Sequence, residues 1–218
     1  MIQAILFDLD DTLYPPHSGV MEQIRALIHR YISTRLHLSD EEGDALRRAY
    51  FQTYGTTMRG LQLNDNIDPD EFLHFVHDFA VDEYIQPNPE LDAVLASIPL
   101  RKIVFTNASR EHAQRVLEAL GIGRHFERIV DVRDVDYEGK PQPTAYRRIC
   151  DLLDLRPEEC LLVDDNVRNL QPAKELGMTT VLVQEHGPNP GNGVDFCLAR
   201  IEEISQVVDR VPGRASGR

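Results

Sequence analysis

Short apolar segments alternate with amphipathic helical patterns from about residue 101 onward. The β-prone segments are residues 102–106, 160–165 and 180–184, a weaker one at 128–132, and an early one, IQAILF, at 2–7. Apolar residues between them recur at the helical spacing i, i+3, i+4 and i+7, as in Ala113, Val116, Leu117 and Leu120. Strands that alternate with helices are typical of a parallel sheet covered on both faces. We therefore predict an α/β fold with a doubly wound, Rossmann-like parallel sheet.

The block from residue 15 to residue 99 differs, because it has helical patterns without a convincing strand. Two apolar stripes have helical spacing: Ile24, Leu27, Ile28 and Tyr31, and Phe72, Phe75, Val76 and Phe79. Ser39 and Glu42 have the spacing of a capping box, and Asp68 stands before a proline at a helix start. We predict that residues 15–99 form a helical domain inserted after the first strand. Residues 1–14 and 100–218 would together form the α/β core.

Composition limits the partners of the chain. Its 218 residues carry a formal net charge of −13 without a basic run, which disfavours binding to a nucleic-acid polymer. No apolar run approaches the about 20 residues of a membrane-spanning helix, and the start has no secretory signal. The three cysteines have no metal-binding or disulfide spacing, so we expect reduced, mostly buried thiols. We predict a cytoplasmic protein that binds neither nucleic acid nor membranes.

Two aspartates follow the first predicted strand, where open α/β sheets place their ligands. Asp8 and Asp10 stand in AILFDLDDTL, two positions apart, so their side chains lean to the same side of an extended chain. Crowded carboxylates resist ionisation together unless a cation lies between them. A hard, oxygen-seeking ion such as Mg²⁺ would relieve that repulsion. A turn with a helix cap is the alternative for this pair.

Other polar groups follow the later strands. Asp164 and Asp165 end the segment CLLVDD, and Thr106 and Asn107 follow KIVF. Lys140, in YEGKPQP, adds a compact positive charge in a loop restricted by glycine and proline. If these strand ends are neighbours, acids, a hydroxyl, an amide and a lysine converge on a site suited to a metal and a phosphoryl group. Helix capping by the Asp164 pair and a surface position for Lys140 are the alternatives.

These residues together resemble the haloacid dehalogenase-like superfamily. Asp8 to Thr12 matches its DxDxT motif, and Thr106, Lys140 and the pair Asp164 and Asp165 match its second, third and fourth motifs in order. The helical block stands where type-1 caps are inserted in that superfamily. Further strings resemble the branch that contains pyrimidine 5'-nucleotidases: YGTTMRGL, LRKIVFTNAS, EHAQRVLEALG and DDNVRNLQPAKELGM.

The resemblance implies roles for the acids. Asp8 would be the nucleophile that forms an aspartyl-phosphate. Asp10 would act as general acid and then as general base, and we expect its neighbours to keep its pKa high. Mg²⁺ would be held by the Asp8 carboxylate, the Asp10 backbone carbonyl and an acid of the fourth motif. We favour Asp165 as the direct ligand and Asp164 as the residue that supports it.

The resemblance also implies roles outside the acids. Thr106 and the backbone of Asn107 would bind phosphoryl oxygens, and Lys140 would hold the nucleophile and the phosphate together. Tyr54 and Arg59, in YGTTMRG, would contact substrate if this loop faces the site, or would form a plain interhelical turn. We expect His74 and His77 to lie on a polar helix face. For His112 the sequence allows either a structural role or contact with substrate.

The leading hypothesis is therefore a Mg²⁺-dependent phosphatase that acts on a small phosphorylated metabolite, with pyrimidine nucleoside 5'-monophosphates as the first candidates. Alternatives are a phosphomutase and a phosphatase for a sugar phosphate or phosphoglycolate. Dehalogenation fits poorly, because that chemistry in the superfamily does not use the second aspartate, present here as Asp10. A sensor that only binds a phosphorylated metabolite is the non-enzymatic alternative.

Overall fold

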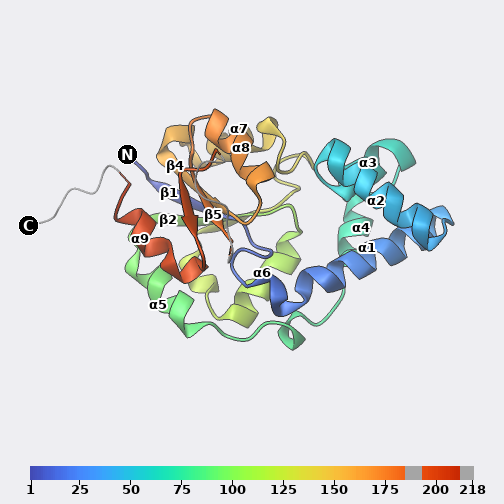
Figure 1. Ribbon diagram of the computed structural model, residues 1–218, viewed down its shortest axis with the longest axis horizontal. Helices are drawn as coiled ribbons and strands as arrows, with labels where there is room; N and C mark the ends of the chain where they lie inside the picture. Colours follow the sequence, from blue (N-terminus) through green and yellow to red (C-terminus); the bar gives the residue numbers. More distant parts are fainter. Residues whose placement is uncertain (185–192, 212–218) are drawn as a thin grey trace, which may run out of the picture.

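A six-stranded parallel sheet forms the centre of the protein in the computed structural model, which describes residues 1–184 and 193–211 (Figure 1). The strand order is β3-β2-β1-β4-β5-β6. The strands are β1 (Ala4–Phe7), β2 (Arg101–Phe105), β3 (Arg128–Val130), β4 (Cys160–Asp164), β5 (Thr179–Val183) and β6 (Phe196–Leu198). The order places β1 between β2 and β4, so the segments that follow these three strands lie at one edge of the sheet.

The helices of the described residues are α1 (Val20–Leu36), α2 (Asp40–Tyr54), α3 (Thr57–Asp65), α4 (Pro69–Val76), α5 (Pro89–Ser97), α6 (Arg110–Leu120), α7 (Pro143–Leu153), α8 (Val167–Glu175) and α9 (Ile204–Val208). None of them is both long and apolar enough to cross a bilayer. The capping box of Ser39 and Glu42 and the cap by Asp68 are present as predicted. Gly121 ends α6 at a φ of +75°, the left-handed conformation that favours glycine at this position.

Each face of the sheet packs against its own set of helices. On one face, α5, α6 and α9 cover side chains such as Ile5 and Phe7 of β1. On the other face, α7 and α8 cover Leu6 of β1 and Leu162 of β4. Figure 1 shows these two helical layers on opposite sides of the strands. The predicted doubly wound α/β fold is therefore present, and all five predicted strands occur in it.

A third apolar cluster lies outside the sheet, among α1, α2, α3 and α4. Its members include Tyr31 and Ile32 of α1 and Phe72 and Leu73 of α4. These four helices stand together at one end of the molecule in Figure 1. Helix α5, by contrast, packs its buried Leu91 and Leu95 into the sheet cluster. We propose that the inserted cap consists of α1 to α4 and that the α/β core resumes before α5. Our prediction from the sequence had the core resume at residue 100.

Strand β6 was not predicted from the sequence. It is three residues long, and Phe196 and Cys197 are only half-buried. A short edge strand lacks the continuous apolar run by which the interior strands are found. Its parallel pairing with β5 shows that tertiary contacts, rather than a local pattern, specify it.

Candidate active site

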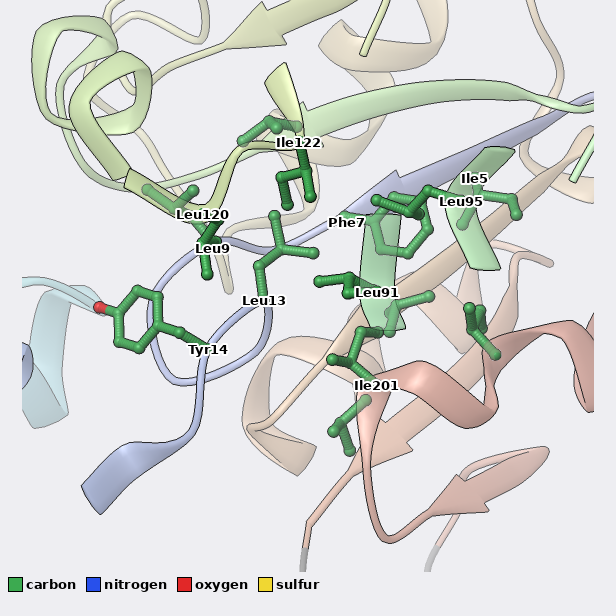
Figure 2. Close-up of a cluster of buried hydrophobic side chains, with 14 of the residues drawn as sticks. Ile5, Phe7, Leu9, Leu13, Tyr14, Leu91, Leu95, Leu120, Ile122 and Ile201 are labelled. Carbon is green, nitrogen blue, oxygen red and sulfur yellow. The ribbon is translucent and has the colours of Figure 1, made fainter. Parts of the chain in front are cut away.

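Two leucines hold the loop after β1 to the core. Leu9 and Leu13 are fully buried, and Figure 2 shows them beside Leu120 and Ile122 of the apolar cluster. The Leu13 N–H donates to the Leu9 carbonyl at 2.9 Å, and Asp11 has a φ of +58°, which closes a tight turn. Aspartate tolerates this left-handed conformation better than most residues. Anchoring the leucines keeps the polar residues of the loop at the sheet edge.

Three carboxylates meet at this edge. Asp8, Asp164 and Asp165 each offer an oxygen, and these atoms lie within 4.8 Å of one another. They come together because β1 and β4 are parallel neighbours, with Phe7 opposite Val163 one position before the acids. Thr12 links the two loops, since its Oγ1 donates to Asp8 at 3.3 Å and accepts the Asp165 N–H at 3.0 Å. The strand ends thus bring together the acids that the sequence places far apart.

Lys140 lies between two of these acids and is 1% exposed. Its Nζ donates to Asp8 Oδ1 at 2.8 Å and to Asp164 Oδ2 at 2.7 Å. Burial lowers the pKa of Lys140, but attraction to the two carboxylates outweighs this and raises it overall. The lysine is therefore a fixed positive charge against the predicted nucleophile, not the surface lysine of the alternative interpretation.

Asp164 and Asp165 have different surroundings. Asp164 is fully buried, and besides Lys140 it accepts the Asn166 N–H at 2.9 Å and Asn169 Nδ2 at 3.0 Å. In the described part of the chain, no other residue donates a hydrogen bond to the Asp165 carboxylate. Burial, and next the charge of Asp164, raise the pKa of Asp165 to about 7. The protein thus supplies hydrogen-bond donors to the Asp164 carboxylate. The Asp165 carboxylate has none of these donors and is repelled by the charge of Asp164.

The crowding also acts on Asp8. Burial raises its pKa well above the usual value, and the charges of Asp164 and Asp165 add to this, while Lys140 opposes them. One lysine therefore does not fully compensate three carboxylates. This excess of negative charge, with oxygen atoms at short separations, fits a hard divalent cation.

Thr106 and Asn107 follow β2, beside the acidic cluster in strand order. Thr106 is buried, and its Oγ1 accepts the Ala108 N–H at 3.0 Å. Asn107 Nδ2 donates to the Lys140 carbonyl at 2.8 Å. The Asn107 side chain therefore fixes the loop that carries Lys140. The contact of the Asn107 backbone N–H with phosphate stays a prediction.

Gly139→Ala tests the close approach of the Asn107 side chain to the Lys140 loop, because a Cβ at Gly139 would lie 2.1 Å from Asn107 Oδ1. We expect the Lys140 loop to shift, with a loss of about 1–3 kcal/mol in the free energy of unfolding. Chemical denaturation of the variant measures the loss. Gly123→Ala is the matched control, since its Cβ would meet only Leu117 at 3.7 Å, an ordinary contact. Equal stabilities of the two variants would contradict the tight approach.

Asp10 is not part of the acidic cluster through its carboxylate. Its Oδ1 accepts Tyr14 Oη at 2.6 Å and lies 2.9 Å from His112 Nε2. Burial raises the pKa of Asp10, but the attraction of His112 and the hydrogen bonds from His112 and Tyr14 lower it overall. The expectation that its neighbours keep this pKa high is wrong for the arrangement seen here, because hydrogen-bond donors surround the carboxylate.

Comparison with known proteins agrees with this geometry. The family described as haloacid dehalogenase-like hydrolase matches residues 2–177, which contain all four motifs and the acidic cluster. The chain belongs to this family.

Curated relatives of this hydrolase include several phosphatases. Glyceraldehyde 3-phosphate phosphatase from Methanopyrus kandleri is 29% identical over 95% of this chain and 97% of its own length. N-acylneuraminate-9-phosphatase from Rattus norvegicus is 24% identical over 87% of this chain and 85% of its own. Phosphate metabolism protein 8 from Saccharomyces cerevisiae is 26% identical over 83% of this chain, and the match spans 61% of the yeast protein.

Solved structures with the same fold include enzymes named for two different reactions, a phosphatase and a dehalogenase. A HAD phosphatase from Thermococcus onnurineus has a TM-score of 0.64 at 20% identity and covers 95% of this hydrolase and 98% of its own chain. L-2-haloacid dehalogenase from Xanthobacter autotrophicus has a TM-score of 0.63 at 17% identity, covering 97% and 100%. At these identities the likeness establishes the fold, and the chemistry depends on the site residues.

The two predicted substrate residues of the cap contact the Lys140 loop of the hydrolase. Arg59 pairs with Glu138 at 3.0 Å, and the Tyr54 carbonyl accepts Gln142 Nε2 at 3.2 Å. Between them, a Cβ on Gly55 would lie 2.5 Å from the ring of Pro141. The turn of the helical block is thus seated against the loop that holds Lys140. Substrate contact by Tyr54 and Arg59 remains a prediction.

Several polar residues of the site were given no role in the sequence reading. Tyr14 contacts Asp10 and Asn169 contacts Asp164. Asn169 lies in the string DDNVRNLQPAKELGM, but neither residue was predicted to take part in the site. His77 is buried, so the polar helix face expected for it is wrong, whereas His74 is exposed as expected. Our prediction left His112 between a structural role and substrate contact. Its place beside Ala113 of the apolar α6 stripe, at the start of that helix, was the sequence signal that it is buried.

Proposed function

We propose that this protein is a Mg²⁺-dependent phosphatase that hydrolyses a small phosphomonoester through an aspartyl-phosphate. The observation that carries the proposal is the contact of Lys140 with Asp8 beside two further acids at the carboxyl edge of the sheet. Lysine and a divalent cation would together offset the charge of a phosphoryl group, which three carboxylates alone would repel.

The donor set fits Mg²⁺. The oxygens of Asp8 and Asp165 lie close together, and Asp165 has no competing side-chain donor among the described residues. Asp164 would support the site through Lys140 and Asn169 rather than bind directly, and the Asp10 carbonyl would complete the protein ligands. The ion would supply charge neutralisation at the phosphoryl oxygens.

The residues would act in two displacements. An Asp8 oxygen attacks phosphorus and forms a P–O bond, while the ester P–O bond breaks and its electron pair goes to the leaving oxygen. Water then attacks the aspartyl-phosphate, the bond to Asp8 breaks, and inorganic phosphate leaves. Lys140 holds Asp8 in place, and Thr106 with the Asn107 N–H would bind the oxygens of the transferred group.

Asp10 would move the protons. It donates one to the leaving oxygen in the first displacement and takes one from water in the second. Its carboxylate form, favoured by Tyr14 and His112, suits the second task. The negative charge of a bound phosphoryl group would raise the pKa of Asp10 and so favour the protonated form needed for the first.

Nucleoside 5'-monophosphates, especially pyrimidine ones, are the substrates that we propose first, because the motif strings resemble that branch of the superfamily. The names of the curated relatives support small phosphorylated metabolites in general. A sugar phosphate or phosphoglycolate is the second candidate. The net charge of −13 supports a small substrate rather than a nucleic-acid polymer, and we keep a cytoplasmic location as part of the proposal.

Phosphate release with Mg²⁺ tests the proposal. The purified protein is given p-nitrophenyl phosphate, a panel of nucleoside monophosphates and a panel of sugar phosphates. We expect release that a chelator abolishes and that added Mg²⁺ restores, with pyrimidine nucleotides hydrolysed fastest. Conversion of a sugar phosphate to an isomer without phosphate release would identify a mutase. Folded protein that releases no phosphate from any of these esters would refute the proposal.

A further inference from the structure

A pair of stacked histidines lies behind Asp10, outside the acidic cluster. His112, in the first turn of α6, is 0% exposed, and its Nε2 is 2.9 Å from Asp10 Oδ1. Tyr14 donates to the same oxygen at 2.6 Å. Among the residues that the structure describes, none donates to Asp10 Oδ2. Two donors thus fix one oxygen of the carboxylate and leave the other for proton exchange.

His112 must carry its proton on Nε2 to make this bond. Asp10 is an acceptor in its carboxylate form, so the ring nitrogen that faces it is the donor. His112 Nδ1 is buried and has no hydrogen-bond partner within residues 1–184 and 193–211. The ring is therefore oriented by its contacts on the Nε2 side and by what packs on its face.

His77 packs on that face. The two rings have centroids 4.4 Å apart and planes 16° apart, which is a stacked arrangement. His77 Nδ1 lies 3.1 Å from Ser109 Oγ, the residue that caps α6 by accepting the His112 N–H. The Arg115 side chain donates to the His77 carbonyl. His77 follows α4 of the helical block, so this ring pair joins that block to the first turn of α6.

Other roles for the ring pair fit less well. A metal site is not indicated, because within the described residues the cluster of potential ligands is Asp8, Asp164 and Asp165, without either histidine. Direct substrate contact by His112 does not agree with its complete burial. A purely structural pair would not need to direct a ring nitrogen at the carboxylate that moves protons.

We propose that His112 is a positioning residue for Asp10, and that His77 holds the His112 ring in place from the helical block. A general acid must lie within hydrogen-bond reach of the leaving oxygen, so fixing Asp10 Oδ1 directs Oδ2 at the reacting group. Seating of the helical block against α6 is then a condition for correct placement of the proton donor. This inference rests on the proposed phosphatase function.

The test compares two esters that differ in their need for a proton donor. An alkyl phosphate expels a strongly basic alkoxide and needs Asp10, whereas p-nitrophenyl phosphate expels an anion that is stable near neutral pH. For His112→Leu we expect kcat/KM to fall by about 100-fold on the alkyl ester, the lower range of general acid catalysis, and by less than about 3-fold on the aryl ester. Asp10→Asn should show the same selective loss.

Rescue and control variants separate positioning from packing. His112→Gln retains an N–H donor on a longer side chain, and we expect it to regain about tenfold in kcat/KM on the alkyl ester. His77→Ala should give a smaller selective loss, and His77→Phe, which keeps a stacking ring, should stay near wild type. His74→Leu is the matched control on the exposed face of α4 and should change neither ester.

Three results would overturn the inference. Equal losses on both esters in His112→Leu would indicate a structural role alone. An unchanged alkyl-to-aryl ratio in His77→Ala would remove the link to the helical block. Wild-type protein that hydrolyses neither ester would refute the phosphatase function itself, and the inference with it, whereas active wild type with uniform losses refutes the inference only.

Discussion

Asp8→Asn is expected to abolish phosphate release, with kcat reduced by at least about 10⁴-fold. The amide is a far weaker nucleophile than the carboxylate, and no neighbouring acid can replace it. Asp164 is held by Lys140, Asn166 and Asn169, and we propose the Asp165 carboxylate as a ligand of Mg²⁺. Steady-state phosphate release with Mg²⁺ present measures the effect, and a thermal melt verifies that the variant is folded.

Asp11→Asn is the matched control for this variant. It is the same change three positions along the same loop, and Asn tolerates the φ of +58° at this position. Asp11 stands outside the acidic cluster, so we expect kcat within about 3-fold of wild type, a change of less than 1 kcal/mol. Substantial turnover by Asp8→Asn would exclude the aspartyl-phosphate and require a different nucleophile.

Lys140→Met is expected to cost about 3–5 kcal/mol in the free energy of unfolding at neutral pH, because it leaves buried carboxylates without their cation. Both Asp8 and Asp164 lie within hydrogen-bond distance of Nζ, and the methionine side chain has a similar length and no charge. We also expect kcat to fall by about 10²–10³-fold, since the phosphoryl group loses a fixed positive charge. Urea denaturation and phosphate release measure the two effects.

The stability loss in Lys140→Met has a defined pH dependence. Removing the lysine raises the folded-state pKa of Asp8 further above its unfolded value. A carboxyl with a raised folded pKa favours folding at low pH and loses that contribution as the pH rises through the folded pKa. The loss should therefore be smaller at pH 5 than at pH 8.

Lys174→Met is the control for this substitution. Lys174 is a partly exposed lysine paired with Asp195 at 3.0 Å, and an exposed ion pair contributes at most about 1 kcal/mol. We expect near-normal stability and activity. A Lys140→Met protein as stable as Lys174→Met would contradict the view that Lys140 compensates the buried acids.

Local patterns were sufficient for much of the fold. The segment AILF is apolar at every position, as a strand covered on both faces must be, and it forms β1 with all four residues buried. Asp68 with Pro69 and Gly121 mark helix ends where the structure has them. Strand β6 has no such signal, because a short, half-buried edge strand is specified by its pairing with β5 rather than by its own residues.

The position of α5 shows a similar limit. Our prediction placed its residues in the inserted helical block, which we bounded at residues 15 and 99. Its buried leucines instead pack on the sheet. An amphipathic helix specifies that one face is buried but not against which partner, so the sequence does not assign it to the block or to the core.

The sequence by itself determined the chemical groups of the site, because Asp8, Asp10, Lys140 and the Asp164 pair follow strands or stand in motif order. Parallel strands end at one edge, so their acids had to meet there. Only the tertiary structure decided which groups touch. Lys140 bonds to Asp8 and Asp164, and Asp10 lies against Tyr14 and the ring of His112. The Asp10–His112 contact joins residues 102 positions apart, and the Lys140–Asp8 contact joins residues 132 apart. Contacts between such distant segments depend on tertiary packing, which no local pattern encodes.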